Sequence, residues 1–259
     1  MQILYQKNYN PAFSSTMRTF RTKNGKEIGN DTYLFRDDID WKQFSKYETE
    51  HFKDKNKVNI IQFASSDGSE AYTQVMAILK RDKTKAEKFF PIHAYDIDKE
   101  MVKSSKSGFL NITLQDISRM RGHSIDYKKY FKIPAPQYRT METLESMCAY
   151  MSYPELLESV PRVYSVSEDL TKRVKFHQND MFKILKNLKD NSNTILMCRN
   201  ILGYFSNNEI YKFITLLSQK LKSNSLFVIG SFDSNNSNIE KYLKQNGFQY
   251  VFKNVYKKI

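Results

Sequence analysis

The stretch from Asn59 to Ile78, NIIQFASSDGSEAYTQVMAI, constrains the fold more than any other part of the chain. It begins with apolar and β-branched residues, a pattern typical of a strand buried on both faces. A turn of small residues at 64–69 follows, and apolar side chains then recur at helical spacing. Strand, turn and helix form the opening unit of a nucleotide-binding type of α/β domain, in which a ligand can approach free backbone N–H groups. The turn has one glycine where a dinucleotide fingerprint has three, so an ordinary βα turn is the alternative interpretation.

The alternation of strand and helix continues toward the C-terminus. It predicts an α/β fold with a mostly parallel sheet that is covered by helices on both faces. A closing pair of strands is expected to add an antiparallel edge. The predicted strands are 58–63, 89–97, 174–177, 194–198, 226–230, 248–252 and 254–257, and the predicted helices are 71–79, 99–107, 181–188, 207–221 and 239–245.

The region before this pattern gives few signals. Residues 1–29 predict no element, whereas Asp38 is in a position to cap a helix that runs to about Phe52. We therefore expect one helix to precede the first strand.

The alternation of strand and helix is interrupted in the middle of the chain. Residues 109–172 contain short helical pieces around 114–120 and 141–151, with prolines between them. Long irregular stretches in compact domains are usually functional or disordered, so we expect an insertion that acts as a lid. A flexible surface excursion is the alternative.

Two acidic residues mark the end of the predicted strand 89–97. An acidic side chain at the end of the second strand of such a domain can accept hydrogen bonds from both hydroxyls of a ribose. Asp98 is better placed to cap the next helix, which Gly108 would close. Asp96 is therefore the candidate ligand of a nucleoside, and Asp98 is expected to be structural.

Composition sets the class of protein. The 259 residues are 40% hydrophobic, enough for a substantial core, and no apolar run approaches the about 18 residues of a membrane span. Neither a signal peptide nor a span is expected, which predicts a cytoplasmic protein. Cys148 and Cys198 lie far apart, so no disulfide and no metal site is expected. The net charge of +13 is compatible with nucleic acid, an anionic surface or acidic protein as partner, or with a background bias toward lysine.

Five short motifs occur, in order, at strand ends where a cofactor would bind. They are 30–37 (NDTYLFRD), 64–72 (ASSDGSEAY), 95–98 (YDID), 176–181 (FHQNDM) and 198–205 (CRNILGYF). Together they resemble the CheR family, the S-adenosylmethionine-dependent methyltransferases that esterify glutamates of bacterial chemotaxis receptors. The resemblance implies a class I, Rossmann-like fold with a seven-stranded sheet, a bacterial source, and S-adenosylmethionine as cofactor with S-adenosylhomocysteine as product.

The resemblance also implies a cofactor pocket. In it, Glu70 would hold the amino group of the methionyl part, Asp96 the ribose hydroxyls, and Asp180 would stand near the adenine where the family usually has Asn. An aspartate can still accept a hydrogen bond from the adenine amino group. The full set of implied cofactor-binding residues is Asn30, Thr32, Arg36, Ala64, Gly68, Glu70, Asp96, Ile97, Asn179, Asp180, Met181, Arg199 and Asn200.

The catalytic candidates that the resemblance implies are Arg36, Arg199 and Tyr204. The acceptor in this family is a carboxylate, which is ionised at neutral pH and needs no strong general base. The site must instead supply alignment and counter-charge. Both arginines would clamp the carboxylate through charge-assisted hydrogen bonds, and Tyr204 would orient the nucleophilic oxygen or pack beside the methyl group. For Arg36, an ordinary solvated arginine is the alternative.

Departures from the family pattern concern the acceptor. Residues 1–29 are too few for the helical domain with which chemotaxis methyltransferases dock on receptors, and 134–163 lengthen the middle region. We expect an N-terminal segment, 1–52, whose helical part covers the cofactor site, and a methyltransferase domain, 53–259, with the insertion at 109–172. The expected partner is an acidic protein or a small carboxylate. The alternatives are methylation of RNA or DNA, binding of S-adenosyl compounds without turnover, and a purely architectural likeness.

Overall fold

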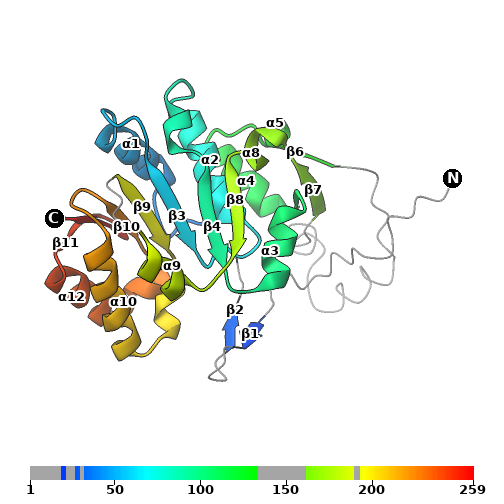
Figure 1. Cartoon of the computed structure of the whole chain (residues 1–259). Coiled ribbons are helices and arrows are strands. Elements are labelled where there is room, and N and C mark those ends of the chain that lie inside the picture. The colour runs from blue at the N-terminus through cyan, green and yellow to red at the C-terminus, as the bar shows by residue number, and fades with distance from the viewer. Residues whose placement is uncertain (1–18, 22–26, 30–31, 134–161, 190–192) are drawn as a thin grey trace.

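Seven strands form the central sheet of the computed structural model, which describes residues 19–21, 27–29, 32–133, 162–189 and 193–259 (Figure 1). Five adjacent strands are parallel. The last strand of the chain pairs antiparallel with this set, and the strand before it pairs antiparallel with the last strand at the edge of the sheet. In spatial order the strands are β11 (Phe248–Phe252), β12 (Val255–Lys258), β10 (Leu226–Val228), β9 (Thr194–Cys198), β3 (Asn59–Phe63), β4 (Ile92–Asp96) and β8 (Val174–Gln178).

Two apolar clusters lie on opposite faces of the sheet. Along β3, Ile60 belongs to one cluster and Ile61 and Phe63 to the other, because successive side chains of a strand point to opposite faces. A strand buried on both faces reads as a continuous apolar run, which is why it could be recognised in the sequence. The first face is covered by α1 (Trp41–His51), α2 (Ser69–Arg81) and α3 (Lys99–Lys106), and the second by α9 (Met181–Asn187), α10 (Asn207–Lys220) and α12 (Ser237–Gln245).

The strand order places a switch point at the middle of the sheet. From β3 the chain proceeds to β4 and β8 on one side, and then returns to β9 and β10 on the other side. In open α/β sheets, ligands bind at such a point, beyond the carboxyl ends of the strands. The predicted mostly parallel, seven-stranded Rossmann-like fold with an antiparallel edge is confirmed. No helix in the described ranges is long and apolar enough to cross a membrane.

The described part of 109–172 is more regular than predicted. It forms an antiparallel three-stranded sheet beside the main one, in the order β5 (Phe109–Ile112), β7 (Arg162–Val166) and β6 (Phe131–Lys132). The predicted helix around 114–120 is confirmed, and the predicted helix at 141–151 lies outside the described residues. The sequence missed the small sheet because its strands pair across a long sequence separation. The short helices of this region are α4 (Leu114–Gly122), α5 (Tyr127–Tyr130) and α8 (Glu168–Thr171).

Other element boundaries also differ from prediction. The strand expected at 89–97 starts only at Ile92, because Ala86–Phe89 form a 3₁₀ turn, η1. The predicted cap of α1 is wrong by two residues: Asp40, not Asp38, accepts hydrogen bonds from the backbone of the first turn. Two short strands of the N-terminal region, β1 (Thr19–Arg21) and β2 (Glu27–Gly29), pair antiparallel and were not predicted.

Candidate active site

The turn between β3 and α2 forms the floor of the site. Ala64, Ser66 and Gly68 all have positive φ angles, of 54°, 47° and 92°. Asp96, at the end of the adjacent strand, accepts a hydrogen bond from the Ser66 N–H at 2.7 Å and so fixes the turn. A Cβ atom on Gly68 would lie 2.6 Å from the ring of Phe176, so conformation and space both require glycine. Ala64 remains exposed where the strand ends, open to a ligand.

Asp96 is buried and bound to backbone on both carboxylate oxygens. Besides Ser66, the N–H of Asp98 donates to it at 2.9 Å. Burial raises the pKa of Asp96, and the backbone hydrogen bonds oppose this rise. Asp98 caps α3 as predicted, and its carboxylate accepts from the N–H groups of Glu100 and Met101. Ile97, between the two aspartates, is half exposed and offers an apolar surface at the same edge.

The fourth predicted motif, 176–181, lies at the end of β8 and reaches the same edge. The Asn179 N–H donates to the carbonyl of Asp96 at 2.9 Å, which fixes the end of β8 beside the end of β4. Asp180 caps α9 by accepting from the Lys183 N–H at 3.0 Å. Met181 is partly buried at the start of that helix. The structure thus brings Asn179, Asp180 and Met181 together with Asp96.

Arg199 occupies the centre of a buried ion cluster. It follows β9, and its side chain is 1% exposed. Its guanidinium donates to Glu70 at 2.8 Å and to Asp38, and it lies over the Trp41 ring at 5.2 Å. A buried cation requires such partners, because removal from water costs more than a single contact returns. Burial raises the pKa of Glu70 to about 8 and lowers that of Arg199 to about 9.

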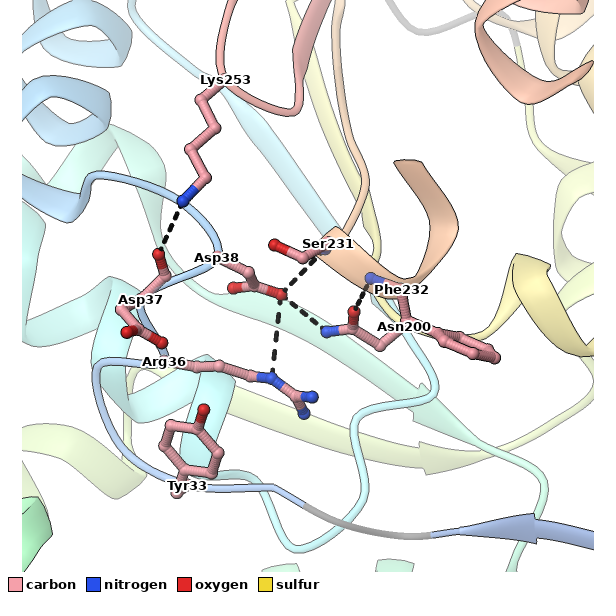
Figure 2. A pocket seen from close by; sticks show the side chains of 8 residues that line it. All are labelled: Tyr33, Arg36, Asp37, Asp38, Asn200, Ser231, Phe232 and Lys253. Carbon is pink, nitrogen blue, oxygen red and sulfur yellow. Dashed lines mark hydrogen bonds and ion pairs between the residues drawn. The ribbon is translucent and has the colours of Figure 1, made fainter. Parts of the chain in front are cut away.

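Asp38 connects this cluster to its surroundings (Figure 2). Its second carboxylate oxygen accepts from the Asn200 side chain at 2.7 Å and from the Ser231 N–H at 3.4 Å, with the Arg36 Nε at 3.8 Å. Sequence reasoning missed this role, since nothing local distinguishes Asp38 from the neighbouring aspartates. Its partners lie more than 160 residues away, apart from Arg36.

A second missed carboxylate supports the loop after β9. Asp233, in the short helix α11 (Ser231–Ser234), is fully buried and accepts from the N–H groups of Asn200 at 2.6 Å, Gly230 at 2.9 Å and Gly203 at 3.1 Å. Burial raises its pKa, against these hydrogen bonds. The signal that could have found it is an acidic residue just after a predicted strand. Asp233 orders the loop that carries the catalytic candidates.

The segment with the predicted Arg36 is fixed from several sides. The Leu34 N–H donates to Asp116 at 3.1 Å, and the Phe35 N–H donates to Thr73 at 3.0 Å. The indole N–H of Trp41 donates to the carbonyl of Arg36 at 2.9 Å. Thr32 is partly exposed at the start of this segment, whereas Asn30 lies outside the described residues.

A cavity of about 260 Å³ opens beside the ion cluster (Figure 2). The Arg36 guanidinium lies 5.2 Å from the Tyr33 ring, and its side chain is 25% exposed. Tyr204, in the 3₁₀ turn η2 (Leu202–Tyr204), packs at 4.8 Å against Phe232 at the rim. Of the catalytic candidates, Arg36 lines the cavity, whereas Tyr204 and Arg199 contact lining residues, Phe232 and Asp38 respectively. The lining residues are Tyr33, Arg36, Asp37, Asp38, Asn200, Ser231, Phe232 and Lys253.

The loops that follow the strands are strongly acidic. These carboxyl-edge loops (64–70, 96–100, 178–182, 199–203 and 230–234) hold seven carboxylates and two cations, a formal charge of −5 in a chain of +13. An acidic crevice favours a cationic ligand by several kT. S-adenosylmethionine carries a sulfonium and an ammonium group, so the residues present fit that cofactor.

Sequence comparison identifies the family. The profile of the CheR methyltransferase SAM-binding domain matches residues 30–162 and 153–251. The chain therefore belongs to the CheR methyltransferase family, its cofactor is S-adenosylmethionine, and its class is the S-adenosylmethionine-dependent methyltransferases. Among curated proteins, none matches the sequence.

Several solved structures are similar at low identity. A magnesium protoporphyrin IX methyltransferase from Synechocystis, solved with bound SAM, is 12% identical, with 83% of this chain and 76% of that chain covered and a TM-score of 0.37. A S-adenosylmethionine-dependent methyltransferase from Clostridium acetobutylicum is 14% identical, with 76% and 52% covered and a TM-score of 0.32. The bifunctional kinase-methyltransferase WbdD is 7% identical, with 85% and 40% covered and a TM-score of 0.43.

Proposed function

We propose that the protein transfers the cofactor's methyl group to a carboxylate of a protein side chain or of a small molecule. The observation that supports this most is the cavity in which Arg36 and Lys253 lie beside the Asp38–Arg199–Glu70 cluster. Its volume of about 260 Å³ suits one side chain or a small acid rather than a nucleotide together with the adjoining nucleotides of a polynucleotide. A carboxylate seated there would meet the cationic groups of Arg36 and Lys253, beside the Asp37 and Asp38 carboxylates that also line the cavity.

The roles of the cavity residues follow from their burial. Arg36 is the arginine that faces the cavity, so it would bind the acceptor through charge-assisted hydrogen bonds. Arg199 is 1% exposed and bound to two carboxylates, so it would act through Asp38 and Glu70 as a positioning residue. Glu70 keeps 17% of its side chain exposed, which would allow its carboxylate to accept a hydrogen bond from the ammonium group of the cofactor.

The chemistry requires little proton transfer. S-adenosylmethionine supplies an electrophilic methyl group on a sulfonium. An acceptor carboxylate has a reference pKa of about 4 and is ionised at neutral pH, so the site has to align it and exclude water. Tyr204 would orient the nucleophilic oxygen by hydrogen bonding, and Phe232 would shield it. Asp96, Ile97 and Asp180 would hold the ribose and adenine at the other end of the crevice.

The nucleic-acid alternative lacks support at this edge. A polynucleotide acceptor would need a basic surface around the cofactor crevice, because phosphate contacts dominate its affinity. The carboxyl-edge loops have a formal charge of −5. The alternative of binding without turnover is opposed by the retained Arg36, Arg199 and Tyr204.

The test is transfer of labelled methyl from S-adenosylmethionine to glutamate-rich peptides, small carboxylic acids and RNA. We expect label on a carboxylate acceptor, released as methanol by mild alkali, as a methyl ester requires. Arg36→Gln should lower kcat/KM for the acceptor about 100-fold, the loss of a charged hydrogen bond. A comparable loss of S-adenosylhomocysteine affinity would instead assign Arg36 to the cofactor, the other role that the family resemblance implies. The matched control is Arg121→Gln, an exposed arginine of α4. Alkali-stable label on RNA would contradict the proposal.

A further inference from the structure

The edge of the sheet opposite the active site carries the opposite charge. Two loops lead into the amino ends of neighbouring strands: 50–57 precedes β3, and 80–88 precedes β4. These amino-edge loops hold eight cationic side chains and four carboxylates, a formal charge of +4. The cationic residues are Lys53, Lys55, Lys57, Lys80, Arg81, Lys83, Lys85 and Lys88. Because β3 has five residues, the two edges lie roughly 16 Å apart.

Side-chain contacts join the two loops into one surface. The Lys88 ammonium donates to the carbonyl of Phe52 at 2.6 Å and to that of Lys53 at 3.1 Å. Between the loops lies a groove of about 240 Å³. This basic groove is lined by Thr49, Glu50, Lys53, Arg81, Asp82, Lys85, Lys88 and Phe89.

Helix ends explain only part of this charge. Both α1 and α2 end at this edge, and the C-terminus of a helix carries about half a negative charge. Together the two helix ends offset about one unit of the formal charge of +4. The cations also crowd one another: burial, and then the neighbouring Lys85, lower the pKa of Lys88. A bound polyanion would relieve this repulsion.

We propose that the basic groove binds the phosphate backbone of a nucleic acid. A membrane is the weaker match, because membrane-binding surfaces insert apolar side chains and the one large apolar residue of the lining, Phe89, is buried. The lining offers no exposed aromatic ring for base stacking, so contacts are with phosphates and do not read sequence. A nucleic acid at this edge lies away from the methyl-transfer cavity and serves as a binding partner, not as the acceptor.

The test is fluorescence anisotropy of a short labelled RNA duplex against the protein over a range of salt. We expect a Kd of about 10⁻⁶ to 10⁻⁴ M at physiological salt, and tighter binding at low salt. The triple variant Lys53→Gln, Arg81→Gln, Lys85→Gln should weaken binding about tenfold or more and reduce the salt slope by about 3. The matched control, Lys103→Gln, Lys212→Gln, Lys241→Gln, removes three exposed lysines elsewhere and should bind like the wild type.

Three outcomes would overturn the proposal. The first is equal weakening in both triple variants, which would mean that only net charge matters. The second is competition by S-adenosylhomocysteine, which would place the RNA at the carboxyl edge. The third is tight binding to phosphatidylserine vesicles, lost in the groove variant, without measurable binding to the duplex. Thermal unfolding of both variants is the check that their fold is intact.

Discussion

The two edges of the central sheet are built by the same alternation of strand and helix, yet they carry opposite charges. The carboxyl-edge loops have a formal charge of −5, and the amino-edge loops have +4. Helix N-termini point to the first edge and C-termini to the second, so acidic and basic side chains are each placed where the helix dipole favours them. The formal charge of each set of loops is larger than the opposite charge of the helix ends at that edge. The difference teaches that the chain's excess of lysine is not spread evenly, and that it avoids the edge at which we propose that the cationic cofactor binds.

The two edges also differ in how deeply their charged side chains are buried. At the carboxyl edge, the charges of the Arg199 cluster are paired and withdrawn from water, whereas Arg81 and Lys85 of the amino edge are exposed. Buried charges tolerate the loss of a partner poorly, and exposed charges tolerate it well. The same substitution should therefore lower the free energy of unfolding more at the Arg199 cluster than in the amino-edge loops.

The largest expected effect is on stability at the carboxyl edge. Arg199→Met leaves Glu70 and Asp38 buried without their cation and should cost about 3 to 5 kcal/mol in the free energy of unfolding. Arg81→Met, the same change in the basic groove, should stay within about 0.5 kcal/mol. Urea unfolding measures both. Equal effects of the two substitutions would remove the distinction between the edges.

The stability of the protein should depend on pH because of a glutamate between the two edges, where α1 packs on α2. Glu48 is fully buried there and accepts from the Gln74 side chain at 3.0 Å, and burial raises its pKa from 4.5 to about 8. The folded state therefore holds a proton that the unfolded state releases, so stability is present below pH 4.5 and is lost as the pH rises toward 8. The expected loss from this group between pH 5 and 7 is about 2 to 3 kcal/mol.

Glu48→Gln isolates that contribution. It keeps an oxygen for the Gln74 side chain but cannot ionise, so its unfolding free energy should change less over this pH range than that of the wild type. Glu50→Gln, an exposed glutamate of the same helix, is the control and should leave the pH dependence unchanged. If Glu48→Gln and wild type followed parallel pH profiles, Glu48 would not be held protonated.

The smallest expected effect concerns Tyr204. Tyr204→Phe removes one hydroxyl and keeps the ring on Phe232, so turnover should fall up to about tenfold while S-adenosylhomocysteine affinity and stability are unchanged. Tyr211→Phe, an exposed tyrosine of α10, is the matched control. Steady-state kinetics with the methyl acceptor separate kcat from KM. Unchanged kcat would exclude Tyr204 from orienting the acceptor.

The sequence was sufficient for those parts of the molecule that local pattern determines. The buried strands are continuous apolar runs, and Asp98 and Gly108 mark the ends of α3 as predicted. The Asp38–Arg199 pair could not be predicted, because it joins positions 161 residues apart and three nearby aspartates look equivalent in sequence. The small sheet of β5, β7 and β6 was missed for the same reason. Its two-residue strand β6 has no periodicity to detect.

The central claim is that the carboxyl edge holds the cofactor, and calorimetric titration with S-adenosylhomocysteine tests it most directly. The proteins to compare are the wild type, Asp96→Ala and Asp98→Ala. Asp98→Ala removes a helix cap and should lower stability by about 1 kcal/mol with little change in affinity. Asp96→Ala removes the proposed ribose ligand and the acceptor of the Ser66 N–H, and should weaken binding about 100-fold or more. Equal affinity of wild type and Asp96→Ala, or no binding by the folded wild type, would contradict the account.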